Sequence, residues 1–110
     1  MGYIIGDNER DADEEGFLLE PDYSDEAANV IAAAEGIALT EEHWAVIRFL
    51  REQYREQGKT PNFRNLLKEV SETVLPGADS KVLYALFPNG PARQAVKVAG
   101  LPKPYGKGGY

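Results

Sequence analysis

The stretch LFPNGPARQAVKVAGLPKPYGKGGY, from Leu86 to Tyr110, decides how the chain is divided. Pro91 lies where a helix would begin, and Gly100 can supply the left-handed residue that ends it. The spacing predicts a short helix between them. The residues beyond are rich in proline and glycine, which disfavour regular structure. We therefore expect a single helical domain over residues 1–100 and a C-terminal arm over residues 101–110.

Upstream of this stretch, apolar residues recur at helical spacing behind good capping residues. The predicted helices run about Asp25–Glu35, Glu41–Gln57, Phe63–Glu72, and from a cap at Asp79 or Ser80 to Phe87. Near the N-terminus two short apolar runs, Tyr3–Ile5 and Phe17–Leu19, predict a small hairpin. The expected fold class is mainly α (α+β), with about five helices, a helix-turn-helix-like pair, an N-terminal β-hairpin and a flexible C-terminal arm.

The helical spacing also predicts which faces are buried. In the first helix the predicted core residues are Ala27, Val30, Ile31 and Ala34, and in the long helix they are Trp44, Val46, Ile47, Phe49, Leu50 and Tyr54. The opposite side of the long helix carries Arg48, Arg51 and Arg55. These arginines predict either a solvated face paired with nearby glutamates or a binding stripe.

The charge is unevenly distributed along the chain. The net charge is -6, yet residues 1–39 hold eleven acidic side chains against Arg10 alone, whereas residues 71–110 have a net charge of +3. A basic arm beside an acidic body favours either docking on an anionic partner or folding back on the acidic front. No apolar run has membrane-spanning length, so we expect a cytoplasmic protein that does not bind membranes.

Metal and cofactor chemistry has little support in the residue types. There is no cysteine and His43 is the only histidine, which excludes a cluster of such ligands. We expect His43 to be buried or to cap a helix. The acidic loop Asp11–Asp22 matches five positions of a calcium-loop template, but it lacks the entering helix and the final glutamate. We expect a solvated acidic turn, no metal site and no cofactor.

Three segments carry a family resemblance. FPNGPARQAVKVAGLPKPYG (87–106), EGIALTEEHWAVIRFLREQYRE (35–56) and EEGFL (14–18) together resemble the DsrC/TusE family of sulfur-relay proteins and sulfite reductase gamma subunits. The resemblance implies a cysteine near the end of the arm that carries sulfur as a persulfide, and in some members a second cysteine in the helix before AGLPKP. In this chain Lys107 and Val96 occupy these two positions.

The missing thiols decide the expected function. A carrier of sulfane sulfur needs a thiolate as its nucleophile, and neither lysine nor valine can replace it. We expect no enzyme activity, and instead a non-catalytic binding or regulatory partner of sulfite reductase or sulfur-relay enzymes. The predicted partner-binding residues are Arg93, Lys97, Leu101, Pro102, Lys103, Pro104 and Tyr105. The prolines reduce the entropy that the arm loses when a partner binds it.

The alternative is a helix-turn-helix regulator that binds nucleic acid. The turn GKTPN (58–62) joins the long helix to the next one, and the candidate contact residues are Arg48, Arg55, Arg64 and Lys68. In many proteins such helix pairs only pack against each other and bind no nucleic acid. The acidic net charge also opposes attraction to phosphates. We expect this alternative to hold only if the four basic residues share one exposed face.

Overall fold

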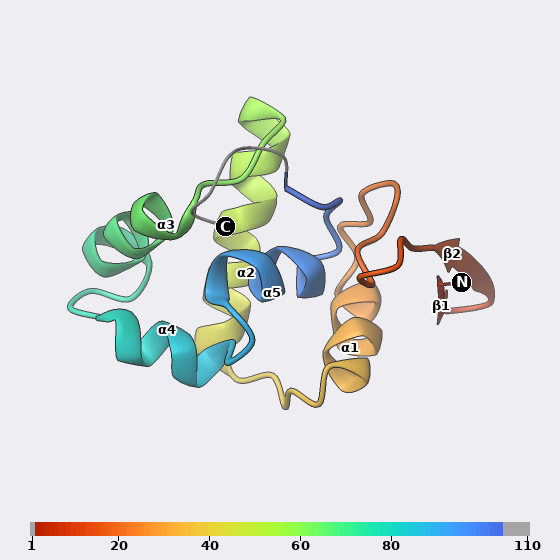
Figure 1. Cartoon of the computed structure of the whole chain (residues 1–110), viewed down its shortest axis with the longest axis horizontal. Coiled ribbons are helices and arrows are strands. Elements are labelled where there is room, and N and C mark those ends of the chain that lie inside the picture. The colour runs from red at the N-terminus through yellow and green to blue at the C-terminus, as the bar shows by residue number, and fades with distance from the viewer. Residues whose placement is uncertain (1, 105–110) are drawn as a thin grey trace.

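The computed structural model describes residues 2–104 and confirms a mainly helical fold with a small hairpin at its N-terminal end (Figure 1). The strands are β1 (Gly2–Ile5) and β2 (Asn8–Asp11), and the helices are α1 (Asp25–Ala34), α2 (Glu41–Gln57), α3 (Phe63–Glu69), the π-helical turn η1 (Val70–Val74), α4 (Ser80–Leu86) and α5 (Pro91–Val98). The predicted third helix thus continues to Val74 with a changed hydrogen-bond pattern. No helix within residues 2–104 is long and apolar enough to cross a membrane.

The predicted helix starts are confirmed by their caps. Ser24, Thr40 and Asp79 each accept a hydrogen bond from a backbone N–H of the first turn, which satisfies a donor that the helix itself leaves free. His43 completes a capping box with Thr40, whose backbone N–H donates to His43 Nδ1 at 3.0 Å. The other ring nitrogen, Nε2, donates to the Leu86 carbonyl at 2.8 Å. The predicted buried, capping role of His43 is therefore confirmed.

The predicted pairing of the hairpin was wrong. β1 pairs with β2 in an antiparallel ladder whose register runs from Gly2 opposite Asp11 to Ile5 opposite Asn8. The connecting turn is short and begins with Gly6 at φ +64°, so the hairpin closes locally without the long loop that the prediction required. Phe17 and Leu18 are instead core residues, each only 1% exposed.

The buried face of α1 is also rotated from the predicted one. Ala27, Ala28, Ile31 and Ala32 are buried. Ala34, which we expected in the core, is exposed, and Val30 is only partly buried. The reason is that α1 packs against both α5 and β1, so its apolar face turns toward the space between them.

The last helix occupies the centre of the fold. Helix α5 lies across α2, with α1 on one side and α3 and α4 on the other (Figure 1), and it contacts all four of them. Its side chains Ala95, Val96 and Val98 have no exposed area. The C-terminal arm therefore follows directly after a buried, central helix.

Candidate functional site

The candidate site is the base of the C-terminal arm, where α5 ends and the chain turns toward Pro104. Gly100 adopts φ +82°, as the sequence predicted, and its N–H donates to the Lys97 carbonyl at 3.1 Å. The Gly100 carbonyl accepts a hydrogen bond from Asp22 N–H at 2.8 Å. The next residue, Leu101, has no exposed area and is part of the core. The turn thus ties the arm's base to the segment that precedes α1.

Arg51 joins the same region from the side of α2. Its Nε donates to the Ala99 carbonyl at 3.0 Å, its Nη2 to the Ser24 carbonyl at 2.7 Å and its Nη1 to Asp25 at 2.9 Å. The side chain is only 8% exposed. One guanidinium therefore connects the end of α5 to the start of α1, a geometry that its planar array of donors allows.

This position corrects the prediction that Arg51 belongs to a solvated arginine face. The spacing contained the signal, because Arg51 follows Ile47 by four residues and so lies over the buried side of α2. Arg48 and Arg55 are exposed, as predicted. Arg55 pairs with Glu52 at 3.8 Å, which fits the expected solvated face.

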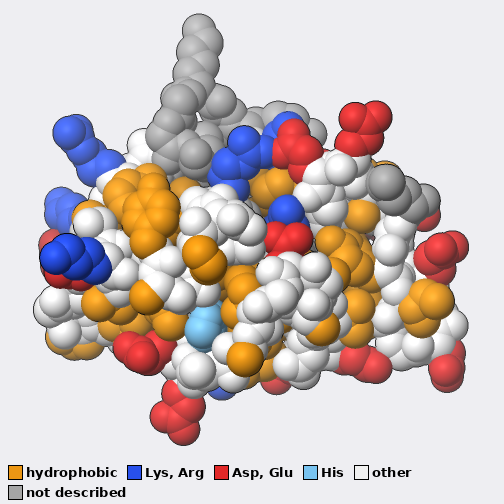
Figure 2. Space-filling view, turned by 60° about the horizontal axis from the view of Figure 1, so that its bottom comes forward, with side chains coloured by type: hydrophobic (Ala, Val, Ile, Leu, Met, Phe, Trp, Pro, Cys, Tyr) orange, Lys and Arg blue, Asp and Glu red, His pale blue; other side chains and the backbone are white. Residues whose placement is uncertain are grey.

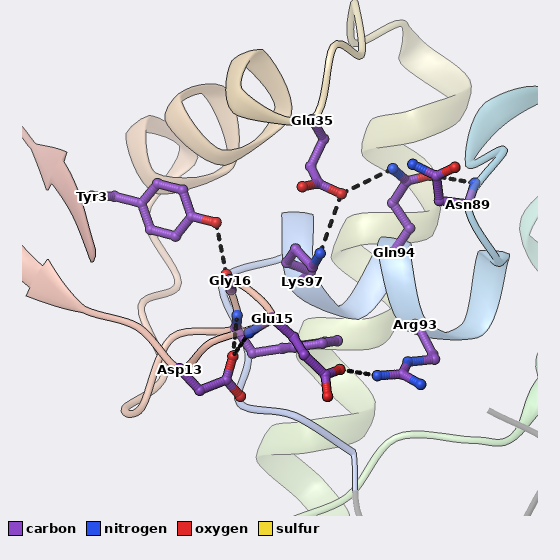
Figure 3. A network of polar contacts seen from close by, with 10 residues as sticks. Tyr3, Asp13, Glu15, Gly16, Glu35, Asn89, Arg93, Gln94 and Lys97 are labelled. Atoms are coloured by element: carbon purple, nitrogen blue, oxygen red, sulfur yellow. Dashed lines mark hydrogen bonds and ion pairs between the residues drawn. The ribbon is translucent and has the colours of Figure 1, made fainter. Parts of the chain in front are cut away.

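The basic residues around the arm's base contact the acidic front of the same chain (Figure 3). Glu15 pairs with both Arg93 on α5 and Lys103 in the arm. Lys97 pairs with Glu35 at 3.3 Å. Of the two outcomes expected from the charge pattern, folding back on the acidic front is therefore observed.

An aromatic ring and an amide complete this network. Arg93 and Lys97 lie over the ring of the buried Phe17, at 5.9 and 5.2 Å from its centre. Gln94, which is 2% exposed, donates to Glu35 at 3.0 Å and accepts from the Asn89 backbone N–H. Gln94, Glu35 and Glu15 were not among the predicted partner-binding residues. A polar residue inside an apolar helix was the only signal for Gln94.

The loop that carries Glu15 is held in place by two further side chains. Asp13 accepts hydrogen bonds from the backbone N–H groups of Glu15 and Phe17. Tyr3 donates from its hydroxyl to the Gly16 carbonyl at 2.7 Å. Burial raises the pKa of Tyr3, so the hydroxyl keeps the proton that this bond requires. The strand β1 thereby fixes the acidic loop beside α5.

Glu15 gives the arm's base a dependence on pH. The hydrogen bond from Lys103 lowers the pKa of Glu15, with the charge of Arg93 acting in the same direction. A lowered pKa means that these contacts are fully present above the ordinary glutamate pKa and are lost as the pH falls through the lowered value.

We expect acid to release Lys103 and Arg93 from Glu15, and Glu15→Gln to do the same at neutral pH. The measurement is the chemical shift of the Lys103 and Gly100 amides in NMR spectra recorded from neutral to acid pH. Glu14→Gln is the matched control, since Glu14 is exposed and makes no ion pair in the described part of the chain. If the Lys103 and Gly100 amide shifts at neutral pH are the same in Glu15→Gln as in the unaltered chain, the ion pairs of Glu15 do not hold the arm.

The predicted arm residues are placed unequally. Pro102, Lys103 and Pro104 are half-exposed and line a hollow of about 180 Å³ together with the end of α2. Val96 is buried in the core. Tyr105 and Lys107 lie outside the described residues. The boundary between body and arm at residue 100 stays a prediction, although the core includes Leu101.

The four candidate nucleic-acid residues are not brought onto one face. Arg48 stacks on Trp44 and Arg55 on Tyr23. The groove between α2 and α3 is lined from α2 by Gln53 and Gln57. At about 100° per residue, Arg48 and Arg55 lie on the other side of α2 from this groove. The structure therefore gives no support to the nucleic-acid alternative.

The described residues also contain no cluster of three or more His, Asp or Glu side chains that could hold a metal ion. The groups at the arm's base are carboxylates, amides and cations that pair with one another. These groups can bind the arm and hold it in position.

Comparisons with known proteins agree with the resemblance of the sequence. The family model described as DsrC-like protein matches residues 4–107. The sulfurtransferase TusE of Escherichia coli O6:H1 is 47% identical over 103 residues, which cover 92% of this chain and 94% of that protein. The TusE of Yersinia pseudotuberculosis is 47% identical over 96 residues, covering 86% and 89%.

Solved structures give the same result. The NMR structure of Allochromatium vinosum DsrC matches with a TM-score of 0.85 and 44% identity over 93% of each chain. The oxidized gamma-subunit of the dissimilatory sulfite reductase of Archaeoglobus fulgidus matches with a TM-score of 0.79 and 37% identity, covering 93% of this chain and 95% of that one. The chain therefore belongs to the DsrC-like protein family.

Proposed function

We propose that this chain is a non-catalytic member of the DsrC/TusE family that binds sulfite reductase or sulfur-relay proteins without carrying sulfur. The observation that carries the proposal is the combination of a family-like arm base with a sequence that contains no cysteine. A thiolate is needed to accept and release sulfane sulfur, so the transfer step has no nucleophile in these 110 residues. Binding does not need that nucleophile.

The named relatives suggest the class of partner. Related proteins are called sulfurtransferases, and a structural neighbour is the gamma-subunit of a dissimilatory sulfite reductase. A protein that presents a similar arm to the same partners would compete with thiol-bearing members. It would thereby lower sulfur transfer without performing it.

The exposed part of the arm's base fits this role. Arg93 and Lys103 are each 42% exposed at the side chain, and both lie beside Glu15. Pro102 and Pro104 flank Lys103 and restrict the backbone, which reduces the entropy lost on binding. Leu101 has no exposed area, so it supports binding by anchoring the arm in the core and not by touching the partner protein. An anionic surface on the partner would replace Glu15 as the ligand of the two cations.

The test is a pull-down from a sulfur-metabolising cell extract, with bound proteins identified by mass. The full chain is compared with the double variant Arg93→Glu and Lys103→Glu, which reverses both exposed cations of the arm's base, and with a version that ends at Pro104, because ending it at Gly100 would remove Leu101 from the core. We expect the full chain to retain sulfite reductase or sulfur-relay proteins, and the double variant and the shortened chain each to retain at most about a tenth as much, a loss of about 1.4 kcal/mol. The full chain should also inhibit sulfur transfer by a cysteine-bearing relative.

Three results would contradict the proposal. Equal retention by all three chains would place the contact outside the arm and its base, and absence of these partners from all three would remove the proposed partner class. Uptake of sulfane sulfur by the chain itself would refute the non-catalytic role. Thermal unfolding of all three chains checks that the double variant and the shortened chain are folded.

A further inference from the structure

Among residues 2–104, the basic side chains that have neither an ion pair nor an aromatic contact lie between the end of α2 and the first turn of α4. Seven cations among residues 2–104 contact an acidic side chain or an aromatic ring. The side chains of Lys59, Arg64, Lys68 and Lys81 are exposed and make no ion pair or hydrogen bond within the described residues. All four lie between the end of α2 and the first turn of α4. Glu69, Glu72 and Asp79 lie in the same stretch, so residues 59–86 have a net charge of +1, against -11 for residues 2–58.

Three of these cations lie on the two helices that carry an aromatic pair. The rings of Phe63 on α3 and Tyr84 on α4 lie 5.7 Å apart and are tilted by 48°. Tyr84 is 49% exposed, whereas Phe63 is partly buried. We call Phe63, Arg64, Lys68, Lys81 and Tyr84 the α3–α4 surface.

Two of the cations lie on α3, the helix of Phe63, and one lies on α4, the helix of Tyr84. Arg64 and Lys68 are four residues apart and share the solvent side of α3, next to the edge formed by Phe63. Lys81 precedes Tyr84 by three residues and lies one turn away on α4. Figure 2 shows basic side chains beside a hydrophobic patch at the end of the molecule that carries these two helices.

We propose that the α3–α4 surface docks an acidic segment of a partner protein, with an aromatic or aliphatic side chain of that segment on the Phe63–Tyr84 pair. Aromatic anchors at the centre and charges at the rim are typical of protein interfaces. Complementary charges speed such encounters and select the partner. This surface shares no residue with the arm, so the inference does not depend on the proposed function.

The charge distribution favours a short acidic segment over nucleic acid. Residues 2–58 carry fifteen acidic side chains against four basic ones. A nucleic-acid strand would extend beyond the few cations of the α3–α4 surface and meet this negative charge. A short peptide remains within about 8 Å of the cations, the range over which charges interact at physiological salt.

The test uses the full chain and a synthetic peptide composed of Glu, Asp and Phe. We expect binding at low salt that weakens as salt rises, with NMR shifts at Arg64, Lys68, Lys81 and Tyr84. The combined variant Arg64→Glu, Lys68→Glu and Lys81→Glu should lower affinity at least about tenfold. Tyr84→Ala should also weaken binding, whereas the control Arg48→Glu on α2 should leave it within about twofold.

Other occupants give distinct results that would overturn the proposal. Equal binding of a peptide in which Ser replaces Phe would show that the aromatic pair is not a docking site. Tighter binding of a single-stranded oligonucleotide of the same charge would assign the surface to nucleic acid. Self-association in sedimentation experiments that is abolished by the charge reversals would assign it to a second copy of the chain.

A final comparison separates this surface from the arm. The chain that ends at Pro104 should bind the acidic peptide as well as the full chain does. Loss of peptide binding on shortening would move the contact to the tail and overturn the inference. Retention of the peptide together with loss of sulfur-relay partners would support both roles independently.

Discussion

Replacing Gly100 with alanine is expected to destabilise the fold by about 3 kcal/mol, because backbone strain and a steric clash act together. Gly100 has φ +82°, a conformation that an alanine adopts only with strain. A Cβ atom added there would lie 2.2 Å from the Asp22 carbonyl oxygen and 3.3 Å from its carbon. Since both atoms are backbone, the turn or the segment before α1 must move.

The movement would break the contact that ties the arm's base to the body. Asp22 N–H donates to the Gly100 carbonyl at 2.8 Å, and a hydrogen bond of this kind contributes about 1 kcal/mol. Urea unfolding followed by circular dichroism measures the loss of stability. NMR shifts of Asp22 and Leu101 show whether the turn has moved.

Gly36→Ala is the matched control for backbone strain alone. Gly36 has φ +75°, and an added Cβ atom would meet nothing within 4 Å. We expect it to cost about 1 kcal/mol. If the two variants lose the same stability, the close approach of Gly100 to Asp22 does not contribute to the fold.

The elements that the sequence predicted correctly depend on local chemistry. A capping side chain needs only the next three residues, so Ser24, Thr40 and Asp79 identified the starts of their helices. Pro91 and Gly100 identified the bounds of the last helix for the same reason. Such signals do not require knowledge of the rest of the fold.

The incorrect predictions concern long-range packing. Phe17 and Leu18 were expected to pair with β1 because apolar runs suit strands, yet they are buried in the core beside α5. The buried face of α1 depended on two neighbours that are distant in sequence. Apolar periodicity shows that a helix has a buried face, but the elements packed against the helix decide which way that face turns.

The site was predicted in part. The charge pattern indicated that the basic C-terminal part could fold back on the acidic front, and Arg93, Lys97 and Lys103 do so. Which acids receive them could not be predicted, because many carboxylates precede α2 and spacing does not distinguish them. The choice of Glu15 and Glu35 follows from the paths of the loops that carry them.

Arg51→Ala is expected to destabilise the protein by about 3 kcal/mol, since it removes a buried guanidinium with three hydrogen bonds. The Ala99 and Ser24 carbonyls would lose a charged donor in a region that water reaches poorly. Asp25 contributes less, because its side chain is 72% exposed. The loss should fall mainly on the contact between α1 and the end of α5.

Two further variants isolate this effect. Arg48→Ala, on the exposed side of the same helix, should change stability by less than about 0.5 kcal/mol. Arg51→Lys should recover only part of the loss, because a single ammonium group cannot reach three acceptors in the geometry of a guanidinium. Urea unfolding gives the free energies, and hydrogen exchange at the Asp22 and Leu101 amides shows where protection is lost. If Arg51→Ala unfolds at the same urea concentration as Arg48→Ala, the guanidinium does not hold the arm's base, and the turn at Gly100 must do so alone.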